Sequence, residues 1–335
     1  MSATMQALVY TAPNMLAVQE IAIPQPAEDE VLVRVAAVGI CGSDMHAYHG
    51  HDSRRPAPLV LGHEAAGTIV SGPREGERVT INPLVVDPSC PAATAGRPHL
   101  SPTRQIISMP PRPGAFAEFV TIPERNVLPI SAGLDFRKAA LVEPIAVAWH
   151  AVRIGLERLD QASDAAKVLV IGGGAIGIAA GLVARRAGVA GLWVAEPNAR
   201  RRALIAEQER LRTFDPLTTV FAEDVDLVID AVGATSTRAA ASRLVRPGGV
   251  IVHVGLLPGM DGFDIRRLTL QEITICGSYC YTPGDFSQTL AAIEAGELGS
   301  LDWFAERSLS EGRRAFADLD EGTVAAPKIV LMPTA

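Results

Sequence analysis

The pattern of apolar and polar positions changes about halfway along the chain. Before Lys167, short runs rich in β-branched residues alternate with proline and glycine turns, as in small irregular β domains. The predicted strands in this part are MQALVYTA, VLVRVAAVGI, AAGTIVSG, ERVTINPL and FAEFVTIP. The first part of the sequence therefore predicts a β-rich domain.

From Lys167 onward, apolar strands alternate with helical stretches. The strands KVLVIG, GLWVAE, VDLVIDAVG, GGVIVHVGL and ITICGSYC are almost continuously apolar, which is typical of a parallel sheet covered on both faces. Helices are predicted in AIGIAAGLVARRAG, in NARRRALIAEQERL after the capping residue Asn198, and in STRAAASRLVRP. This alternation predicts a doubly wound α/β sheet. Beyond Pro283, a helix FSQTLAAIEAGEL, a segment SLSEGRRAFADLDEG and a strand KIVLMP follow.

Length and composition agree with two globular domains. The chain has 335 residues, more than the roughly 250–300 at which a single core usually stops growing. Its net charge of -7, with scattered basic residues, gives no electrostatic footprint for nucleic acid or an anionic membrane. No secretory signal or long apolar run is visible.

The four cysteines, at positions 41, 90, 276 and 280, are widely placed. A disulfide framework is therefore not expected, and a reducing cytoplasm is the expected compartment. We expect Cys276 and Cys280 to lie on one face of a strand as packing residues.

A glycine-rich turn follows the strand KVLVIG. Residues 172–177 fit G-x-G-x-x-G with glycines at 172, 174 and 177, and a helix follows, as dinucleotide binding requires. Glu196 ends the next strand, where a carboxylate accepts hydrogen bonds from the ribose hydroxyls and repels a 2′-phosphate. We therefore predict NAD rather than NADP, although Arg200 and Arg201 lie close by. The predicted cofactor-binding residues are Gly172, Gly174, Ile176, Gly177, Glu196, Arg201, Val232, Val254 and Ser278.

Potential metal ligands gather upstream of this turn. The segments VGICGSDMHAYHG and LGHEAAG contain Cys41, His46, His49, His63 and Glu64, and LVEPIAVAWHAV contains Glu143 in an apolar run. Mixed sulfur, nitrogen and oxygen ligands suit a catalytic zinc with about three protein ligands. Each residue alone is more easily explained by packing or capping, but together, before a dinucleotide fold, they indicate a metal site.

On these residues the chain resembles the zinc-dependent medium-chain dehydrogenase/reductase superfamily, specifically its polyol branch of sorbitol, L-idonate and L-threonine dehydrogenases. The matching motifs are G-I-C-G-S-D-x-H at 39–46, G-H-E at 62–64, V-E-P-x-A-V at 142–147, the glycine motif and G-S-Y after the last strand of the sheet. The resemblance implies a GroES-like catalytic domain from residues 1–144 and 282–335 and a Rossmann domain from residues 145–281. The active site is then expected in the cleft between them, in a homodimer or homotetramer.

The resemblance also implies roles for individual side chains. Cys41 and His63 are expected to bind the catalytic zinc, with either Glu64 or Glu143 as a third ligand. His63 and Glu64 can both reach one ion only if the backbone bends there, because neighbours on an extended strand point to opposite faces. Asp44 is expected to accept a hydrogen bond from the far nitrogen of His63.

The expected chemistry is the oxidation of a secondary alcohol on a polyol or sugar-derived substrate. Zinc lowers the pKa of the substrate hydroxyl, Ser43 takes its proton, His46 passes the proton towards solvent, and hydride moves to the nicotinamide. Ser43 as a turn cap and His46 as a solvent-facing residue are the structural alternatives. Tyr48, His49 and Phe116 are candidates for substrate contact, with packing as the more ordinary role.

The segment DPSCPAATAGRPHLS departs from the family pattern. Family members bind a structural zinc there through C-x2-C-x2-C-x7-C, a spacing that falls on Asp87, Cys90, Ala93 and Ser101 in this chain. Alanine cannot bind zinc and serine binds it poorly, so we predict that the structural zinc is absent.

Two other functions have the same fold. One is a nicotinamide-binding protein without turnover, and the other is a zinc-free quinone or enoyl reductase. Zinc analysis of the purified protein separates both from the zinc-dependent enzyme.

Overall fold

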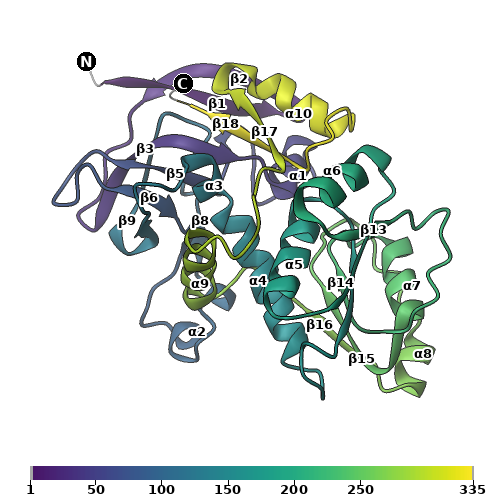
Figure 1. Ribbon diagram of the computed structural model, residues 1–335. Helices are drawn as coiled ribbons and strands as arrows, with labels where there is room; N and C mark the ends of the chain where they lie inside the picture. The colour runs from purple at the N-terminus through teal and green to yellow at the C-terminus, as the bar shows by residue number, and fades with distance from the viewer. Residues whose placement is uncertain (1–2, 334–335) are drawn as a thin grey trace. The chain divides into compact units, whose positions relative to one another are not determined.

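The computed structural model describes residues 3–333 and divides the chain into two compact units (Figure 1). The first unit comprises Met1–Glu143, Phe286–Glu294 and Phe304–Ala335, and the second comprises Pro144–Asp285 and Ala295–Trp303. The sequence placed residues 282–335 wholly in the catalytic domain, whereas residues 282–285 and 295–303 group with the second unit. The assignment of these units as folding domains stays a prediction.

The first unit contains the β-rich part that the sequence predicted. Its largest sheet has the order β10-β6-β5-β3-β18-β17, with β9 paired to β3. The strands are β3 (Glu30–Gly39), β5 (Glu64–Ile69), β6 (Arg78–Ile81), β9 (Phe119–Pro123), β10 (Val127–Pro129), β17 (Phe304–Ser308) and β18 (Lys328–Met332). Both chain ends therefore contribute to one sheet, as the yellow β17 and β18 next to the purple β3 show in Figure 1.

Smaller elements complete this unit. A second sheet has the order β2-β1-β4, and β7 pairs with β8. The elements are β1 (Thr4–Ala12), β2 (Met15–Ala22), β4 (Leu59–Val60), β7 (Leu84–Val85), β8 (Gln105–Ile106), α1 (Gly42–Tyr48), α2 (Pro91–Thr94), α3 (Phe136–Ala140) and α10 (Gly312–Asp320). Two helices, α4 (Val142–Leu156) and α9 (Pro283–Glu294), cross from one unit to the other along the chain.

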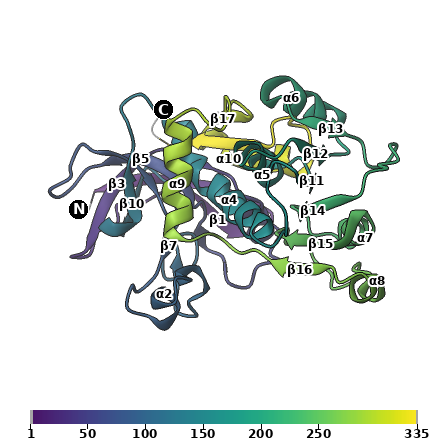
Figure 2. The same cartoon turned by 60° about the horizontal axis from the view of Figure 1, so that its bottom comes forward.

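The second unit is a six-stranded parallel sheet. Its order β13-β12-β11-β14-β15-β16 is that of the doubly wound dinucleotide fold, so the predicted fold class is confirmed. The strands are β11 (Lys167–Ile171), β12 (Gly191–Ala195), β13 (Arg212–Phe214), β14 (Val225–Asp230), β15 (Val245–His253) and β16 (Thr274–Gly277). The helices are α5 (Ala175–Arg186), α6 (Ala199–Glu209), α7 (Thr235–Leu244) and α8 (Ile265–Leu270). Figure 2 shows α5 on one face of the sheet and α7 and α8 on the other.

Most predicted elements are present, and the missed ones are short or polar. The sequence missed β2, in which Leu16 is the one buried residue, and the three-residue edge strand β13. It also placed Cys276 and Cys280 on one strand, which is wrong. Cys276 lies in β16, but Cys280 follows the strand with a positive φ of 47°.

Apolar packing fixes the backbone around the predicted metal ligands. Phe116 and Phe316 are fully buried and meet edge to face with ring centroids 5.8 Å apart. The Phe116 ring lies against Gly62, where a Cβ atom would overlap it. The core of the first unit therefore reaches directly to the residue that precedes His63.

Candidate metal centre and nucleotide-binding turn

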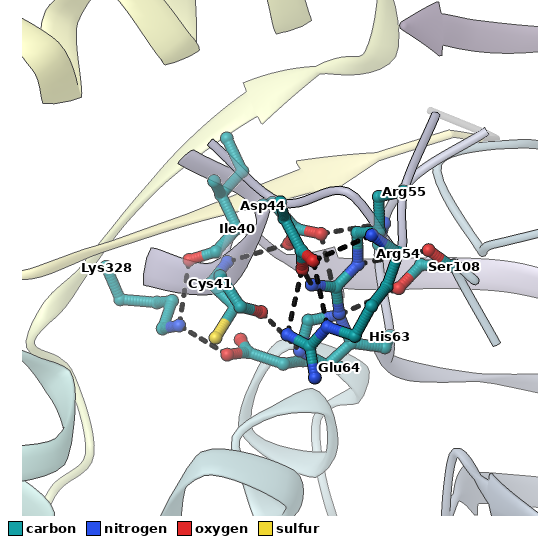
Figure 3. Close-up of polar contacts among 12 residues, drawn as sticks. Ile40, Cys41, Asp44, Arg54, Arg55, His63, Glu64, Ser108 and Lys328 are labelled. Carbon is teal, nitrogen blue, oxygen red and sulfur yellow. Dashed lines mark hydrogen bonds and ion pairs between the residues drawn. The ribbon is translucent and has the colours of Figure 1, made fainter. Parts of the chain in front are cut away.

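Three predicted ligands converge in the first unit. Ligand atoms of Cys41, His63 and Glu64 all lie within 4.8 Å of one another, and Figure 3 shows the Cys41 sulfur facing the Glu64 carboxylate. Cys41 caps α1 just after β3, and Glu64 begins β5. The two strands are antiparallel neighbours with Gly39 opposite Glu64, so sheet pairing brings these segments together.

The backbone bend that lets His63 and Glu64 reach one ion lies at Gly62. This residue has a φ of 90°, in the left-handed region that favours glycine. His63 lies before β5 and outside regular structure, whereas Glu64 is its first residue. Neighbouring side chains that would diverge on a straight strand therefore reach one place.

Glu64 forms a buried ion pair that the sequence did not predict. Its Oε1 atom accepts a hydrogen bond of 2.6 Å from Lys328 Nζ, and Lys328 also donates to the Ile40 carbonyl over 2.8 Å. Figure 3 shows both contacts beside Cys41. The sequence could not predict this pair, because Lys328 lies 264 residues after Glu64 and is a single lysine at the start of an apolar strand.

The second carboxylate oxygen of Glu64 supports a cation site. Glu64 Oε2 is buried and has no hydrogen-bond partner among the described residues, a state that is costly for an anionic oxygen. A thiolate, an imidazole and a carboxylate match the ligand types of catalytic zinc. The residues present therefore fit a zinc ion, and an ion here would satisfy the orphaned oxygen.

Glu143 lies outside this group of three. It is buried in the first turn of α4 and acts electrostatically on Lys328. Burial lowers the pKa of Lys328, but the charges of Glu64, Cys41 and Glu143 outweigh burial and raise it above its usual value. The geometry thus favours Glu64 over Glu143 as the third ligand, while the ligand assignment itself stays a prediction.

Asp44 holds the backbone on both sides of the site. Its carboxylate accepts hydrogen bonds from the backbone amides of Cys41 (3.0 Å) and Gly62 (3.2 Å), and Oδ1 lies 3.5 Å from His63 Nδ1. Burial raises the pKa of Asp44, but the charges of His63 and Arg55 and these hydrogen bonds lower it overall. Asp44 is therefore an anion beside the far nitrogen of His63, where the sequence expected it.

A second oxygen approaches the same imidazole nitrogen. Ser108 Oγ lies 3.3 Å from His63 Nδ1, and the Ser108 carbonyl accepts a hydrogen bond from Arg55 Nε. Neither Ser108 nor Arg55 was predicted from the sequence, because the contacting residues are 45 and 53 positions apart and the two residues lie in segments without a motif.

The predicted proton relay begins next to the ligands. Ser43 Oγ lies 3.5 Å from His63 Nε2, and Ser43 and His46 are three residues apart on α1, a spacing that places them on one helix face. Burial lowers the pKa of His46, and the nearby charges of His49, His51 and Arg55 lower it further. The neutral imidazole, which can accept a proton, is therefore favoured near neutral pH.

The three candidates for substrate contact have structural partners. Tyr48 and Phe116 are buried in the core and both pack against Phe316. His49 Nε2 lies 2.9 Å from Asp320 Oδ1. These contacts match the packing alternative, and no contact to substrate is assigned to them.

Local hydrogen bonds hold the segment in which the family has a structural zinc. Asp87 accepts from the amide and hydroxyl of Ser89, α2 begins after Cys90, and the Ser101 hydroxyl lies 3.1 Å from that of Thr103. Within residues 3–333, the only group of three potential ligands close enough to share an ion is Cys41, His63 and Glu64. The absence of the structural zinc stays a prediction.

The glycine-rich turn has the backbone that its motif requires. Gly172 has a φ of 99°, and a Cβ atom on Gly177 would overlap the Gly172 carbonyl. Glu196 Oε2 accepts from the amide of Gly173 and Oε1 from the amide of Asn198, each over 2.8 Å. Glu196 therefore braces the turn at the end of β12.

The remaining predicted cofactor residues lie near this turn and along one sheet edge. Arg201 Nη1 lies 3.5 Å from Glu196 Oε2. Val232, Val254 and Ser278 follow the carboxyl ends of the adjacent strands β14, β15 and β16, the edge at which doubly wound sheets bind dinucleotides. The geometry is that of a nucleotide site, and the individual contacts stay predictions.

Comparisons with known proteins agree with this geometry. Residues 27–132 match the alcohol dehydrogenase GroES-like domain, and residues 175–295 match the zinc-binding dehydrogenase domain. The chain is 33% identical to L-galactonate-5-dehydrogenase of Escherichia coli K12 over 314 residues, which cover 88% of this chain and 89% of that protein.

Two solved structures are similar over almost the whole chain. A short chain alcohol dehydrogenase from E. coli CFT073, complexed with NADH, is 25% identical, with a TM-score of 0.90 and coverage of 99% of this chain and 100% of that one. L-Idonate 5-dehydrogenase from E. coli K-12 is also 25% identical, with a TM-score of 0.89 and coverage of 99% of both chains. Among the described residues, no helix is long and apolar enough to cross a membrane.

Proposed function

Because the chain belongs to the zinc-dependent medium-chain dehydrogenase/reductase family, in its polyol branch, we propose that it oxidises a secondary hydroxyl of a sugar acid with NAD. Two observations carry the zinc-dependent chemistry: ligand atoms of Cys41, His63 and Glu64 lie within 4.8 Å of one another, and the buried Glu64 Oε2 has no hydrogen-bond partner within residues 3–333. The sugar acid is proposed because the relatives include dehydrogenases of L-galactonate and L-idonate.

Cys41, His63 and Glu64 would hold the zinc ion. When bound, zinc supplies a Lewis acid that lowers the pKa of a substrate hydroxyl. The chain's own residues prepare the site for this role. Asp44 faces the far nitrogen of His63, and Lys328 holds one oxygen of Glu64.

Ser43 and His46 would move the proton. The Ser43 hydroxyl, next to His63 Nε2, accepts the proton of the substrate hydroxyl and passes it to His46. The lowered pKa of His46 keeps its imidazole neutral and ready to accept. The turn at residues 172–177 and Glu196 would bind the dinucleotide, whose nicotinamide accepts the hydride.

Zinc content and substrate oxidation test this proposal together. We expect about one zinc per chain in the wild type, the same in Cys90→Ala, and almost none in Cys41→Ala. NAD reduction is then measured with L-galactonate, L-idonate, sorbitol, xylitol, galactitol, L-threonine and simple secondary alcohols. A zinc-loaded protein that oxidises only polyols would exclude the sugar acid, and one that oxidises none of these compounds would contradict the whole proposal.

We also propose a homodimer that forms through the β16 edge of the sheet. β16 is the last strand in the sheet order, and large apolar side chains are exposed around it. They are Ile275 in β16 itself and Ile265 and Leu270 in α8, the helix that precedes β16. Exposed apolar patches of this kind mark association surfaces.

Light scattering of two matched variants tests the dimer. Ile275→Lys, in β16, should give a monomer. Leu217→Lys, at a residue that is also exposed but follows the opposite edge strand β13, should leave the mass unchanged. A dimeric Ile275→Lys variant would refute this interface.

For the compartment, we propose the reducing cytoplasm, which the four free cysteines support.

A further inference from the structure

Ser108 has an unusual backbone conformation next to the predicted metal centre. Its φ of 73° lies in the left-handed region, which residues with a Cβ atom adopt at a cost. The residue is fully buried, and its hydroxyl lies 3.3 Å from His63 Nδ1. Costly conformations persist where the surroundings fix them, and they gather at functional sites.

Arg55 donates a hydrogen bond to the backbone of Ser108. The residue is only 3% exposed, and its Nε atom donates to the Ser108 carbonyl over 3.1 Å. Its Nη1 atom donates to Asp52 over 2.7 Å, so the Asp52 carboxylate balances the charge of the guanidinium and orients it. A buried guanidinium is retained only with such partners, and here one partner is the backbone of the strained residue. Figure 3 shows Arg55 and Ser108 beside His63.

Two oxygen atoms, one from Ser108 and one from Asp44, lie close to Nδ1 of His63. A metal-bound neutral imidazole carries a single N–H on its other nitrogen. At Nδ1, that N–H faces the Ser108 hydroxyl at 3.3 Å and the Asp44 carboxylate at 3.5 Å. An anionic acceptor makes an imidazole a stronger donor to its metal than a neutral hydroxyl does. The position of Ser108 would therefore affect the orientation of the His63 ring and how strongly His63 holds a bound metal.

We propose that Arg55 is a positioning residue for the metal centre. It holds Ser108 in the left-handed conformation, so that the Ser108 hydroxyl shares the His63 N–H with Asp44. This inference rests on the metal-binding role of His63 in the proposed function. It adds a support, from Asp52 through Arg55 and Ser108, that the motifs of the sequence do not contain.

Two substitutions of Ser108 separate the effect of losing its hydroxyl from the effect of its strained backbone conformation. Ser108→Gly removes the hydroxyl and tolerates positive φ, whereas Ser108→Ala removes it and keeps the strain. Arg55→Met removes the guanidinium. Arg54→Met is the matched control, because Arg54 also donates to Asp52 but is exposed, with 55% of its side chain accessible.

The measurements are the visible absorption spectrum of the cobalt-substituted protein and the rate of zinc release to a chelator. We expect Ser108→Gly and Arg55→Met to shift the cobalt bands and to speed zinc release about 10-fold to 100-fold. Arg54→Met should change neither. Lost catalysis alone would not show the effect, whereas a shifted cobalt spectrum reports the metal's own surroundings.

The possible results separate this inference from the proposed function. If the wild type binds no zinc, the proposed function is wrong and this inference falls with it. If the wild type binds zinc and oxidises alcohols, but Ser108→Gly leaves the spectrum and zinc release unchanged, only the positioning role is overturned. If Arg55→Met does not fold, Arg55→Lys replaces it, because lysine keeps a cation beside Asp52 but loses the Nε donor to the Ser108 carbonyl. An unchanged cobalt spectrum and zinc release in that variant would overturn the role of Arg55.

Discussion

Replacing Lys328 by methionine should destabilise the metal-free protein strongly. The Lys328 and Glu64 side chains are 3% and 0% exposed, and their charged atoms lie 2.6 Å apart. Methionine keeps most of the apolar length but leaves the Glu64 carboxylate buried without a cation and the Ile40 carbonyl without its donor. Removing one partner of a buried pair costs about 3–5 kcal/mol, so we expect the free energy of unfolding to fall by that amount.

Lys167 provides a control with the same chemistry at the surface. Its Nζ atom also lies 2.6 Å from a carboxylate, that of Glu223, but the two side chains are 48% and 45% exposed. Lys167→Met should therefore lower the free energy of unfolding far less than Lys328→Met does. The comparison isolates burial, because the ion type and the distance are the same.

The assay is urea unfolding of both variants, without metal and with saturating zinc. A bound zinc would place positive charge near Glu64, so the cost of Lys328→Met should fall by roughly 1 kcal/mol or more in the zinc-loaded protein. Equal costs for the two metal-free variants would refute the reasoning from burial. An unchanged cost with zinc would refute the placement of the metal beside Glu64.

Three further perturbations test other parts of the molecule. Glu196→Gln should lower the preference for NAD over NADP about tenfold or more, measured as the ratio of kcat/KM values, because a neutral side chain no longer repels the 2′-phosphate; an unchanged ratio contradicts the assignment. Burial raises the pKa of Glu209 above 4.5 despite hydrogen bonds from Ser300 and Leu301, so wild-type stability should decline as pH rises from 4.5 through the folded-state pKa. Glu209→Gln should therefore gain roughly 1 kcal/mol at about pH 8 and little at about pH 4, and equal thermal shifts at both would contradict this. Burial lowers the pKa of His63, but the charges of Asp44 and Cys41 raise it well above 6.5, so zinc uptake near neutral pH should release protons to a pH indicator, whereas uptake without release would contradict it.

Local patterns predicted the second unit well. The G-x-G-x-x-G turn, the helix cap at Asn198 and the apolar parallel strands depend on residues close in sequence, and all of them are present.

The polar strand β17, with Glu306 and Arg307 in its five residues, carries no apolar signal because its stability comes from pairing with β18. Strands of this kind are visible only once their partners are known.

In the candidate site too, residues in local motifs could be predicted from the sequence, whereas residues that act from distant segments could not. Cys41, His63 and Glu64 belong to short motifs that the family resemblance identified, and the required bend could be foreseen from the chemistry of neighbouring strand residues. Lys328, Arg55 and Ser108 act on them from distant segments. Their roles depend on burial and sheet pairing, which a single sequence does not display.

The place of β18 has a consequence for biosynthesis. β18 pairs with β3 on one side and β17 on the other, yet it follows every other strand of the described residues. While the ribosome is still producing the nucleotide-binding unit, β3 already has β5 and β9 as partners, but its last residues, Val38 and Gly39, lack β18, and unpaired strand edges are a known hazard for aggregation. Glu64 also lacks its lysine during that time. The buried pair of Glu64 and Lys328 can therefore form only after β18 has been synthesised, and a chain truncated before Lys328 should depend on chaperones to remain dispersed.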